Sequence, residues 1–357
     1  MRLHSIRIQN YKSLQDVTLT DLQAVNLLIG PNNSGKSNVL KALEWVKNAV
    51  DAPYNTAQSI IKGNVKDTFN KDAANERSFY CIFEGENAFF HIKNFKSAYY
   101  PIEGIILENK ILTNTNNSAG WNSSFSKILK DYLSKTFIYT IVPSTFSKPT
   151  SYLYTNQVNA DGSNLVSFLD VMRNDYPLIF KQIIKDLSDC VPSFTEITTT
   201  KIGTQGLTQT IRFFDKNNNS YLADEVSEGV LYFLALLCIV HQPEPPKLLL
   251  LEEPEKGVHP RRIKEVMDYI FTLAETKDIQ IIMTTHSPYV VDEFKDLEEC
   301  IYIFDRDAAA TTVKNLQRDV IQPFNDLAKA NNANTFNISR SLGDHWTTGL
   351  LGGVPKS

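Results

Sequence analysis

The sequence predicts an α/β fold in which helices cover a largely parallel sheet. An apolar run at 25–29 is followed by a glycine-rich loop at 30–37 and by a helix-forming run at 38–50. Farther along, helices and strands alternate from 228 to 304, and the strands there are almost continuously apolar. Strands buried on both faces have this composition, and their alternation with helices is typical of parallel sheets.

The first third of the chain is predicted to be rich in strands. Apolar and polar residues alternate at 2–8 and 14–19, as expected for strands with one buried face. With 25–29 they give three N-terminal strands, and 51–76 is polar and turn-rich. Further strands are expected at 77–84, 87–93 and 102–112, and an Asn/Ser-rich loop at 113–124.

The rest of the chain is predicted to begin with a mostly helical part, from 125 to about 190, which an apolar strand at 136–142 interrupts. Because no heptad repeat is visible anywhere, no long coiled coil is expected. The remaining elements are expected in this order: strands 195–201 and 207–214, helix 228–241, strand 247–251, helix 260–275, strand 279–284, short helix 287–294 and strand 299–304.

The composition is that of an ordinary globular protein. The 357 residues suffice for two or three domain-sized units, with 42% hydrophobic and 21% charged residues. The net charge of −4 gives no general basic character that would indicate nucleic-acid binding. The longest apolar run, 230–240, is too short to span a bilayer, and no signal-peptide core precedes the first strand. We therefore expect a cytoplasmic protein with no membrane partner, whose four scattered cysteines stay reduced.

The glycine-rich loop reads Gly-Pro-Asn-Asn-Ser-Gly-Lys-Ser at residues 30–37 and lies between a predicted strand and a predicted helix. This pattern in this context is a phosphate-binding loop, because backbone N–H groups and the helix N-terminus surround phosphate oxygens. Lys36 is expected to reach the β- and γ-phosphates, and the Ser37 hydroxyl to hold Mg²⁺. The expected ATP-binding residues here are Gly30, Asn32, Asn33, Ser34, Gly35, Lys36, Ser37 and Asn38.

A second motif places two adjacent carboxylates, Glu252 and Glu253, at the end of a strand of four leucines. Ligands bind at the carboxyl ends of strands in open α/β sheets, and adjacent strand residues point to opposite faces. Glu252 could complement Ser37 at Mg²⁺, and Glu253 could orient or deprotonate an attacking water. By itself, the same pattern also fits a solvated acidic turn.

Two further motifs lie at helix starts. His286 follows an apolar strand and could donate a hydrogen bond to a γ-phosphate, and the next two residues, Ser287 and Pro288, fit an N-cap and the first helical position. Ser227, in the sequence Val-Ser-Glu-Gly, opens the helix predicted at 228–241. Such a serine either only caps the helix or helps its N-terminus to bind a γ-phosphate.

The order of these four motifs resembles that of the ABC-type ATPases. The opening Ile-Arg-Ile-Gln-Asn-Tyr-Lys-Ser-Leu at 6–14 is similar to the SMC/RecF/OLD branch, which implies that Lys12 and Ser13 also touch the nucleotide. The stretches 161–165, 252–260 and 342–355 are similar to stand-alone bacterial OLD-like ATPases of anti-phage defence or toxin systems. The resemblance implies that Ser227 and Gly229 act in trans, on a nucleotide held by Lys36 of another subunit.

This resemblance implies an ATPase head with two lobes, an N-terminal mixed β lobe and a parallel-sheet core, together with a helical insertion and no coiled coil. The expected parts are an N-terminal lobe with the phosphate loop at 1–112, an insertion at 113–215, a lobe with the signature, acidic and histidine motifs at 216–310, and a tail packed on the ATPase at 311–357. The catalytic residues would be Glu253, His286 and Lys36, and the metal ligands Ser37 and Glu252.

The sequence departs from the family pattern at several positions. Glu252 stands where ABC proteins usually have Asp, and the signature reads Ser-Glu-Gly instead of Ser-Gly-Gly. The candidates for the glutamine of a Q-loop are Gln157 and Gln58. OLD proteins carry a nuclease domain after the histidine motif, and here Asp305 and Asp307 superficially resemble its Asp-x-Asp pair, although a strand-end turn explains them better.

The leading functional hypothesis is an ATP-hydrolysing switch that forms a homodimer or larger oligomer and controls a separately encoded effector, expected to be a nuclease, in bacterial anti-phage defence. The alternatives are a RecF-like ATPase that binds duplex DNA and a self-contained OLD-like nuclease. Nucleic acid is therefore a further candidate partner. Aromatic residues in 51–200 are available as docking anchors, or else pack in the core: Phe89, Phe90, Tyr99, Tyr100 and Trp121.

Overall fold

The computed structural model describes the chain in two compact units. The described residues are 2–51, 78–83, 88–90, 105–107, 110–111, 132–133, 136–202, 208–307, 310–331 and 341–354. The first unit consists of Met1–Thr136, Lys247–Leu250 and Gln280–Ser357, and the second of Phe137–Pro246 and Leu251–Ile279. Gln58, Tyr99, Tyr100 and Trp121, which carried sequence-based predictions, lie outside the described residues, as do the side chains of Phe89 and Phe90.

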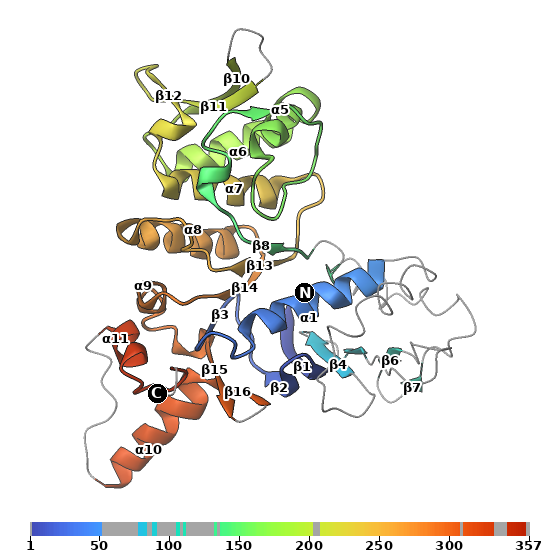
Figure 1. Ribbon diagram of the computed structural model, residues 1–357, viewed down its shortest axis with the longest axis vertical. Coiled ribbons are helices and arrows are strands. Elements are labelled where there is room, and N and C mark those ends of the chain that lie inside the picture. Colours follow the sequence, from blue (N-terminus) through green and yellow to red (C-terminus); the bar gives the residue numbers. More distant parts are fainter. Residues whose placement is uncertain are drawn as a thin grey trace. The chain divides into compact units, whose positions relative to one another are not determined.

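The first unit is built around parallel strands. β3, β14 and β15 are neighbours, with Thr284 of β14 opposite Leu28 and Ile303 of β15 opposite Ile29 in parallel register. The strand order β16-β15-β3-β14-β13 places β3 in the middle (Figure 1). Every residue of β3 and of β14 is buried, as the apolar sequences of these strands predict.

The elements of the first unit are β1 (Leu3–Tyr11), β2 (Leu14–Leu19), β3 (Val25–Ile29), α1 (Lys36–Asp51), β4 (Ser78–Phe83), β5 (Ala88–Phe90), β6 (Ile105–Leu107), β7 (Lys110–Ile111), β14 (Gln280–Thr284), α9 (Pro288–Asp292), η5 (Glu298–Cys300), β15 (Ile301–Asp307), β16 (Ala310–Asn315), η6 (Leu316–Ile321), α10 (Gln322–Ala330) and α11 (Leu342–Thr347). β13 (Leu248–Glu252) begins in the first unit and ends in the second.

A second, antiparallel sheet in this unit has the order β2-β1-β4, and a further sheet has the order β5-β6-β7. Lys12 and Ser13 form the two-residue turn between β1 and β2, since Tyr11 pairs with Leu14. Lys12 adopts a positive φ of 51°, which tight hairpin turns require. The mixed β lobe predicted at the N-terminus is therefore present.

Gln280 joins the antiparallel sheet to the parallel one. Its side-chain amide donates to the Leu3 and Gln23 carbonyl oxygens, at 2.8 and 3.0 Å. Its Oε1 accepts from the Leu3 N–H at 2.9 Å and from the Tyr132 hydroxyl at 2.7 Å. Because a buried amide is costly unless its polar atoms are paired, this network fixes the start of β1 against β14.

The second unit combines helices with a small antiparallel sheet. Its elements are β8 (Ile138–Tyr139), η2 (Pro143–Thr145), β9 (Thr150–Ser151), α5 (Leu165–Asp175), α6 (Pro177–Cys190), β10 (Glu196–Ile202), β11 (Thr208–Phe214), β12 (Ser220–Leu222), η3 (Ala223–Glu225), α7 (Glu228–His241), η4 (Pro260–Arg262) and α8 (Ile263–Thr276). The sheet has the order β10-β11-β12, and β9 also pairs with β11.

The core of the second unit is helix α7. All its residues from Gly229 to Val240 are buried, which explains why its sequence is apolar all round. Phe233 stacks on Tyr269 of α8 with ring centroids 4.0 Å apart. Asp186 of α6 accepts from His241 at 2.5 Å and from Lys277 at 2.6 Å, which ties the ends of the three helices together.

The helical prediction for 125–190, which excepted an apolar strand at 136–142, is wrong over 143–164 and right over 165–190, and the short strand β8 lies within 136–142. Apart from η2 and the short strands β8 and β9, 136–164 has no regular structure. Polar side chains there bond to backbone groups instead: Asn164 accepts from the Asn159 N–H, and Asp161 accepts from the Ser163 N–H. Such local bonds compete with helix formation.

No helix in the part of the chain that the structure describes is long and apolar enough to cross a membrane. The longest described helix, α1, has 16 residues. A long coiled coil is thus absent from the described residues, in agreement with the missing heptad pattern.

Candidate functional site

The phosphate loop lies between the buried strand β3 and helix α1, as the motif requires. Its first glycine, Gly30, has a φ of 145°, and a Cβ there would lie 2.2 Å from the Phe304 carbonyl oxygen. Gly35 has a φ of 110°, and a Cβ there would lie 2.7 Å from the Thr311 hydroxyl oxygen. Only glycine satisfies both conditions, so the two glycines are needed for the shape of the loop itself.

Lys36, the first residue of α1, turns back over the loop. Its ammonium donates to the Gly30 carbonyl oxygen at 2.7 Å and to the Pro31 carbonyl oxygen at 3.0 Å. The side chain is only 4% exposed. A positive charge is therefore held over a loop of small residues at a helix N-terminus, where anions are stabilised.

A buried hydroxyl inside this loop has no partner among the described residues. Ser34 is 1% exposed, and its Oγ makes no hydrogen bond. The Thr284 hydroxyl, at the end of the neighbouring strand β14, is also buried and makes no hydrogen bond to the described residues. Because unpaired buried polar groups are costly and rare, these atoms indicate that the loop is shaped for a polar ligand such as a phosphate group.

The other residues predicted to bind ATP differ in exposure. Asn32 and Asn33 are exposed, and Ser37 and Asn38 are half-buried in the first turn of α1. The Asn38 amide does not point out of the site, but donates to the Ser13 hydroxyl at 2.9 Å.

The β1–β2 turn lies against the phosphate loop. A Cβ on Gly35 would be 3.0 Å from the Ser13 Oγ. Lys12 in the same turn places its ammonium 5.6 Å from the centre of its neighbour Tyr11's ring. Ser13 thus lies against the loop and Lys12 is its neighbour in the turn, and contact of these two residues with a nucleotide stays a prediction.

Thr311 on β16 is a residue of this site that the sequence did not reveal. Its hydroxyl donates to the Ser34 carbonyl oxygen at 2.8 Å and lies 3.1 Å from the Ser13 Oγ. It is 3% exposed and also limits the space at Gly35. No motif surrounds it, and its partners are nearly 300 positions away, so only the folded structure could identify it.

Replacing Thr311 by valine is expected to weaken ATP binding about 3- to 10-fold, because it removes the hydroxyl that holds the loop and keeps the shape of the side chain. The measurement is the Kd of a fluorescent ATP analogue. Thr311→Ser should restore the affinity, and Thr312→Val, at the exposed neighbouring position, is the matched control. An unchanged affinity in the Thr311→Val protein would show that the hydroxyl does not shape the binding loop.

His286 lies just beyond the carboxyl end of β14, beside the strand that leads into the loop. The parallel pair Thr284 and Leu28 fixes this register, and His286 and Gly30 each follow two residues later. The imidazole is exposed. Ser287 is the N-cap residue of α9, with Pro288 at the first helical position, but its side chain makes no cap hydrogen bond; instead its N–H donates to the Thr285 hydroxyl at 2.9 Å.

The acidic pair follows the buried leucines of β13. Glu252 and Glu253 are half-buried, and both belong to the second unit. Glu253 has a positive φ of 50°, and its carbonyl oxygen accepts the Lys256 N–H at 2.9 Å in a tight turn. A non-glycine residue in this conformation costs about 1 kcal/mol or more, and such outliers concentrate at functional sites.

The predicted signature, also in the second unit, lies at the start of α7. Ser227 is its N-cap, and its Oγ accepts the Val230 N–H at 3.4 Å. The Glu228 carboxylate accepts the His259 N–H at 3.1 Å, which connects the signature to the loop after the acidic pair. The glutamate that departs from the family pattern therefore has a structural partner.

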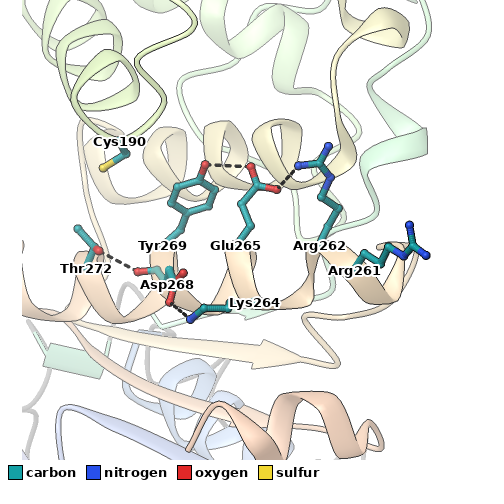
Figure 2. Close-up of a pocket in the computed structure, with 8 residues that line it drawn as sticks. All are labelled: Cys190, Arg261, Arg262, Lys264, Glu265, Asp268, Tyr269 and Thr272. Carbon is teal, nitrogen blue, oxygen red and sulfur yellow. Dashed lines mark hydrogen bonds and ion pairs between the residues drawn. The ribbon is translucent and has the colours of Figure 1, made fainter.

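Gly229 is fixed from the side by helix α8. A Cβ on Gly229 would lie 2.7 Å from Oε2 of Glu265. Glu265 itself accepts from the Arg262 guanidinium and the Tyr269 hydroxyl, each at 3.2 Å (Figure 2). Burial and the nearby Glu265 charge raise the pKa of the Tyr269 phenol well above its usual value, so the phenol remains a donor.

These side chains belong to an open pocket of about 520 Å³ along α8, which Cys190 and Thr272 also line (Figure 2). Its charged groups are largely paired with one another: Arg262 with Glu265, and Lys264 with Asp268 at 3.2 Å. Of the residues that line the pocket, Glu265 is the one that lies against Gly229 of the signature helix.

Two of the remaining candidate residues, Gln157 and Asp305, take part in local hydrogen bonds. Gln157 is exposed, and its backbone carbonyl accepts the amide of Asn164. The carboxylate of Asp305 accepts the N–H of its own neighbour Arg306 in the β15–β16 hairpin. No group of three or more potential metal-binding His, Cys, Asp or Glu side chains occurs among the described residues.

Comparisons with known protein families give two matches. A model of an "AAA ATPase domain" matches residues 1–224, which is more than half of the chain. A second model, described as "AAA domain, putative AbiEii toxin, Type IV TA system", matches residues 157–292.

Individual proteins of known name are also similar to the chain in sequence. The chain is 22% identical over 331 residues to an "ATP/GTP phosphatase" of Helicobacter pylori, covering 81% of the chain and 86% of the relative. It is 40% identical over 45 residues to the DNA replication and repair protein RecF of Prosthecochloris aestuarii, which is 13% of the chain and 12% of RecF. A similarly short match covers 4% of a chromosome partition protein Smc.

Among solved structures, the SMC head domain from Thermotoga maritima matches 88% of the chain and 99% of its own length, with a TM-score of 0.53 and 14% identity. At this identity the likeness concerns the fold. It agrees with the mixed α/β architecture and parallel-sheet core of the chain.

Proposed function

Because the chain belongs to the family of AAA ATPase domains, we propose that it is an ATP-driven switch that dimerises around ATP and controls a separately encoded effector. ATP binding and hydrolysis follow from the family and from the similarity over 331 residues to an ATP/GTP phosphatase. The observation that carries the proposal is the phosphate loop. Neither Gly30 nor Gly35 has room for a Cβ, the buried Ser34 hydroxyl has no hydrogen-bond partner among the described residues, and the Lys36 ammonium donates to the Gly30 carbonyl oxygen.

In this proposal, different residues of the chain bind the phosphates of ATP, activate the attacking water and recognise the γ-phosphate. Lys36 exchanges its bonds to loop carbonyls for bonds to phosphate oxygens, which are stronger because both partners are charged. Glu253 orients the attacking water and accepts its proton. His286 donates a hydrogen bond to the γ-phosphate and so distinguishes ATP from ADP.

Mg²⁺ is the metal that the family implies. The hydroxyl of Ser37 and the carboxylate of Glu252 are oxygen donors, the type that Mg²⁺ prefers, and substrate phosphates and water usually complete its coordination. A cluster of protein carboxylates is therefore not required for it. When bound, Mg²⁺ would supply positive charge to the phosphate oxygens.

The dimer is proposed from the position of Ser227 and Gly229. Ser227 caps a helix whose N-terminus attracts anions, and Gly229, in the first turn of that helix, lies against Glu265 of α8. We propose that these residues close over ATP held by Lys36 of a second copy. Because only ATP has the γ-phosphate, ATP favours the closed dimer and hydrolysis opens it.

The effector is proposed from the match to an AAA domain named after the AbiEii toxin of type IV toxin–antitoxin systems. An ATPase switch needs an output, and we propose a separately encoded nuclease as that output. The biological setting would be anti-phage defence.

The test is co-expression of the chain with its neighbouring genes, followed by size-exclusion chromatography with ATP, with ADP and without nucleotide. We expect one neighbour to elute with the chain, and its nuclease activity to depend on the nucleotide. As a control, the Lys36→Ala chain should lose this nucleotide dependence.

RecF-like DNA binding is the second candidate, because the chain shares 40% identity with RecF over 45 residues. It would replace the effector proposal if the chain eluted alone in every nucleotide state and bound duplex DNA with salt-dependent affinity. Plasmid cleavage by the purified chain alone would instead indicate a self-contained nuclease.

A further inference from the structure

The C-terminal segment 341–353, which we name the C-terminal strap, lies against two motifs of the ATPase site. At its start it contacts α9, the helix that follows His286 (Figure 1). At its end it contacts Gly30, the first glycine of the phosphate loop. Both contacts lie within the first unit.

At α9 the strap is held by the carboxylate of Asp292. This carboxylate accepts from the Ser341 hydroxyl, at 2.8 and 3.0 Å, and from the Gly343 N–H at 2.8 Å. A Cβ on Gly343 would lie only 2.3 Å from the carbonyl oxygen of Pro288. Helix α11 thus meets the first residue of α9 backbone to backbone.

At the phosphate loop the strap is held by Gly353. Its carbonyl oxygen accepts from the Trp346 indole N–H at 3.2 Å, which closes the strap on itself. A Cβ on Gly353 would lie 2.6 Å from Cγ2 of Ile303 and 3.5 Å from the Cα of Gly30. Ile303 is buried on β15, directly beside the strand that leads into the loop.

We propose that the C-terminal strap is a positioning element of the ATPase site, which sets the places of the phosphate loop and of the helix after His286. The inference rests on the proposed function of these motifs. Flexible side chains absorb small shifts, but backbone atoms in direct contact move only with their elements, and packed interiors transmit such strain. The strap touches no predicted ATP-contacting atom except through Gly30, so its effect is indirect.

The two ends of the strap should have separable effects on catalysis. The Gly353 end lies at the loop that holds phosphates, so a disturbance there should change ATP affinity. The Asp292 end lies on the helix whose N-terminus follows His286, so a disturbance there should change turnover at saturating ATP. A strap that only stabilised the fold would change neither quantity in the folded protein.

The phosphate-loop end is tested by comparing Gly353→Ala with Gly352→Ala. Both glycines have a positive φ, 68° and 80°, so the backbone strain is matched, but a Cβ on Gly352 meets nothing within 4 Å. Gly353→Ala is expected to bind a fluorescent ATP analogue about tenfold more weakly than Gly352→Ala, since it forces a methyl group into close contacts. Equal affinities of the two variants would overturn the proposal for this end.

The α9 end is tested with Asp292→Ala and Ser341→Ala, which remove the same contact from opposite sides. We expect turnover at saturating ATP to fall about tenfold in Asp292→Ala, with the Kd for ATP within about twofold of the original. Asp292→Asn, which keeps one acceptor oxygen but loses the charge, should recover part of the rate. Glu299→Ala, an exposed position outside the contact, is the control.

Thermal unfolding of every variant separates these outcomes from a purely structural role. If the variants melt earlier while turnover and affinity stay unchanged, the strap only stabilises the fold and the proposal fails. If the original chain neither binds nor hydrolyses ATP, the proposed function itself fails, and the two failures are thereby distinguished.

Discussion

Replacing Glu253 by glutamine is expected to lower ATP turnover by about 10²-fold or more, while ATP still binds. Such a loss corresponds to about 2.7 kcal/mol of transition-state stabilisation. Glutamine keeps the size and much of the hydrogen bonding of glutamate, but it cannot accept a proton from the attacking water. The variant should therefore accumulate as an ATP-bound dimer, because the dimer closes but hydrolysis no longer opens it.

The conformation of Glu253 makes this substitution a clean test. Its φ of 50° costs about the same for any unbranched side chain, so the glutamine variant should adopt the same turn. Turnover is measured by phosphate release, and dimer formation by size-exclusion chromatography with ATP and with ADP. Glu275→Gln, at an exposed position of α8, is the matched control. Unchanged turnover in the Glu253→Gln chain would remove Glu253 from the role of base.

The elements that the sequence predicted well are those with a single strong local signal. Helix α7 was predicted at 228–241 and is observed at Glu228–His241, because a serine N-cap precedes a continuous apolar run. Strands β2 and β3 also have their predicted bounds. β1 extends to Tyr11, beyond the predicted end at residue 8, because pairing with β2 and β4 continues through its polar residues.

The residues of the phosphate loop were predicted from their spacing, and the structure adds what the pattern leaves out. The close approach of Gly30 to Phe304, and of Gly35 to Thr311, involves strands more than 270 positions away. Thr311 itself carries no motif, and its function becomes visible only when the chain folds. For the same reason β16 and the helices after it were not predicted.

Lys36→Ala is expected to weaken ATP binding by about 10- to 100-fold, the loss expected when a charged donor to phosphate oxygens is removed. Lys36 is buried, and its ammonium bonds to the Gly30 and Pro31 carbonyl oxygens, so it is held directly over the loop. Affinity is measured by titration with a fluorescent ATP analogue, at two salt concentrations. Lys41→Ala, at an exposed position of the same helix, should bind ATP normally.

The control for folding is Lys36→Met, which keeps most of the apolar stem of the lysine but has no charge. If loss of charge is the cause, Lys36→Met and Lys36→Ala should lose a similar share of affinity while Lys36→Met unfolds at nearly the original temperature. If both variants bound ATP as tightly as the original chain, the loop at 30–37 would not be the nucleotide site. The roles proposed for Glu253 and the C-terminal strap would then lose their common basis, because both act on phosphates that this loop holds.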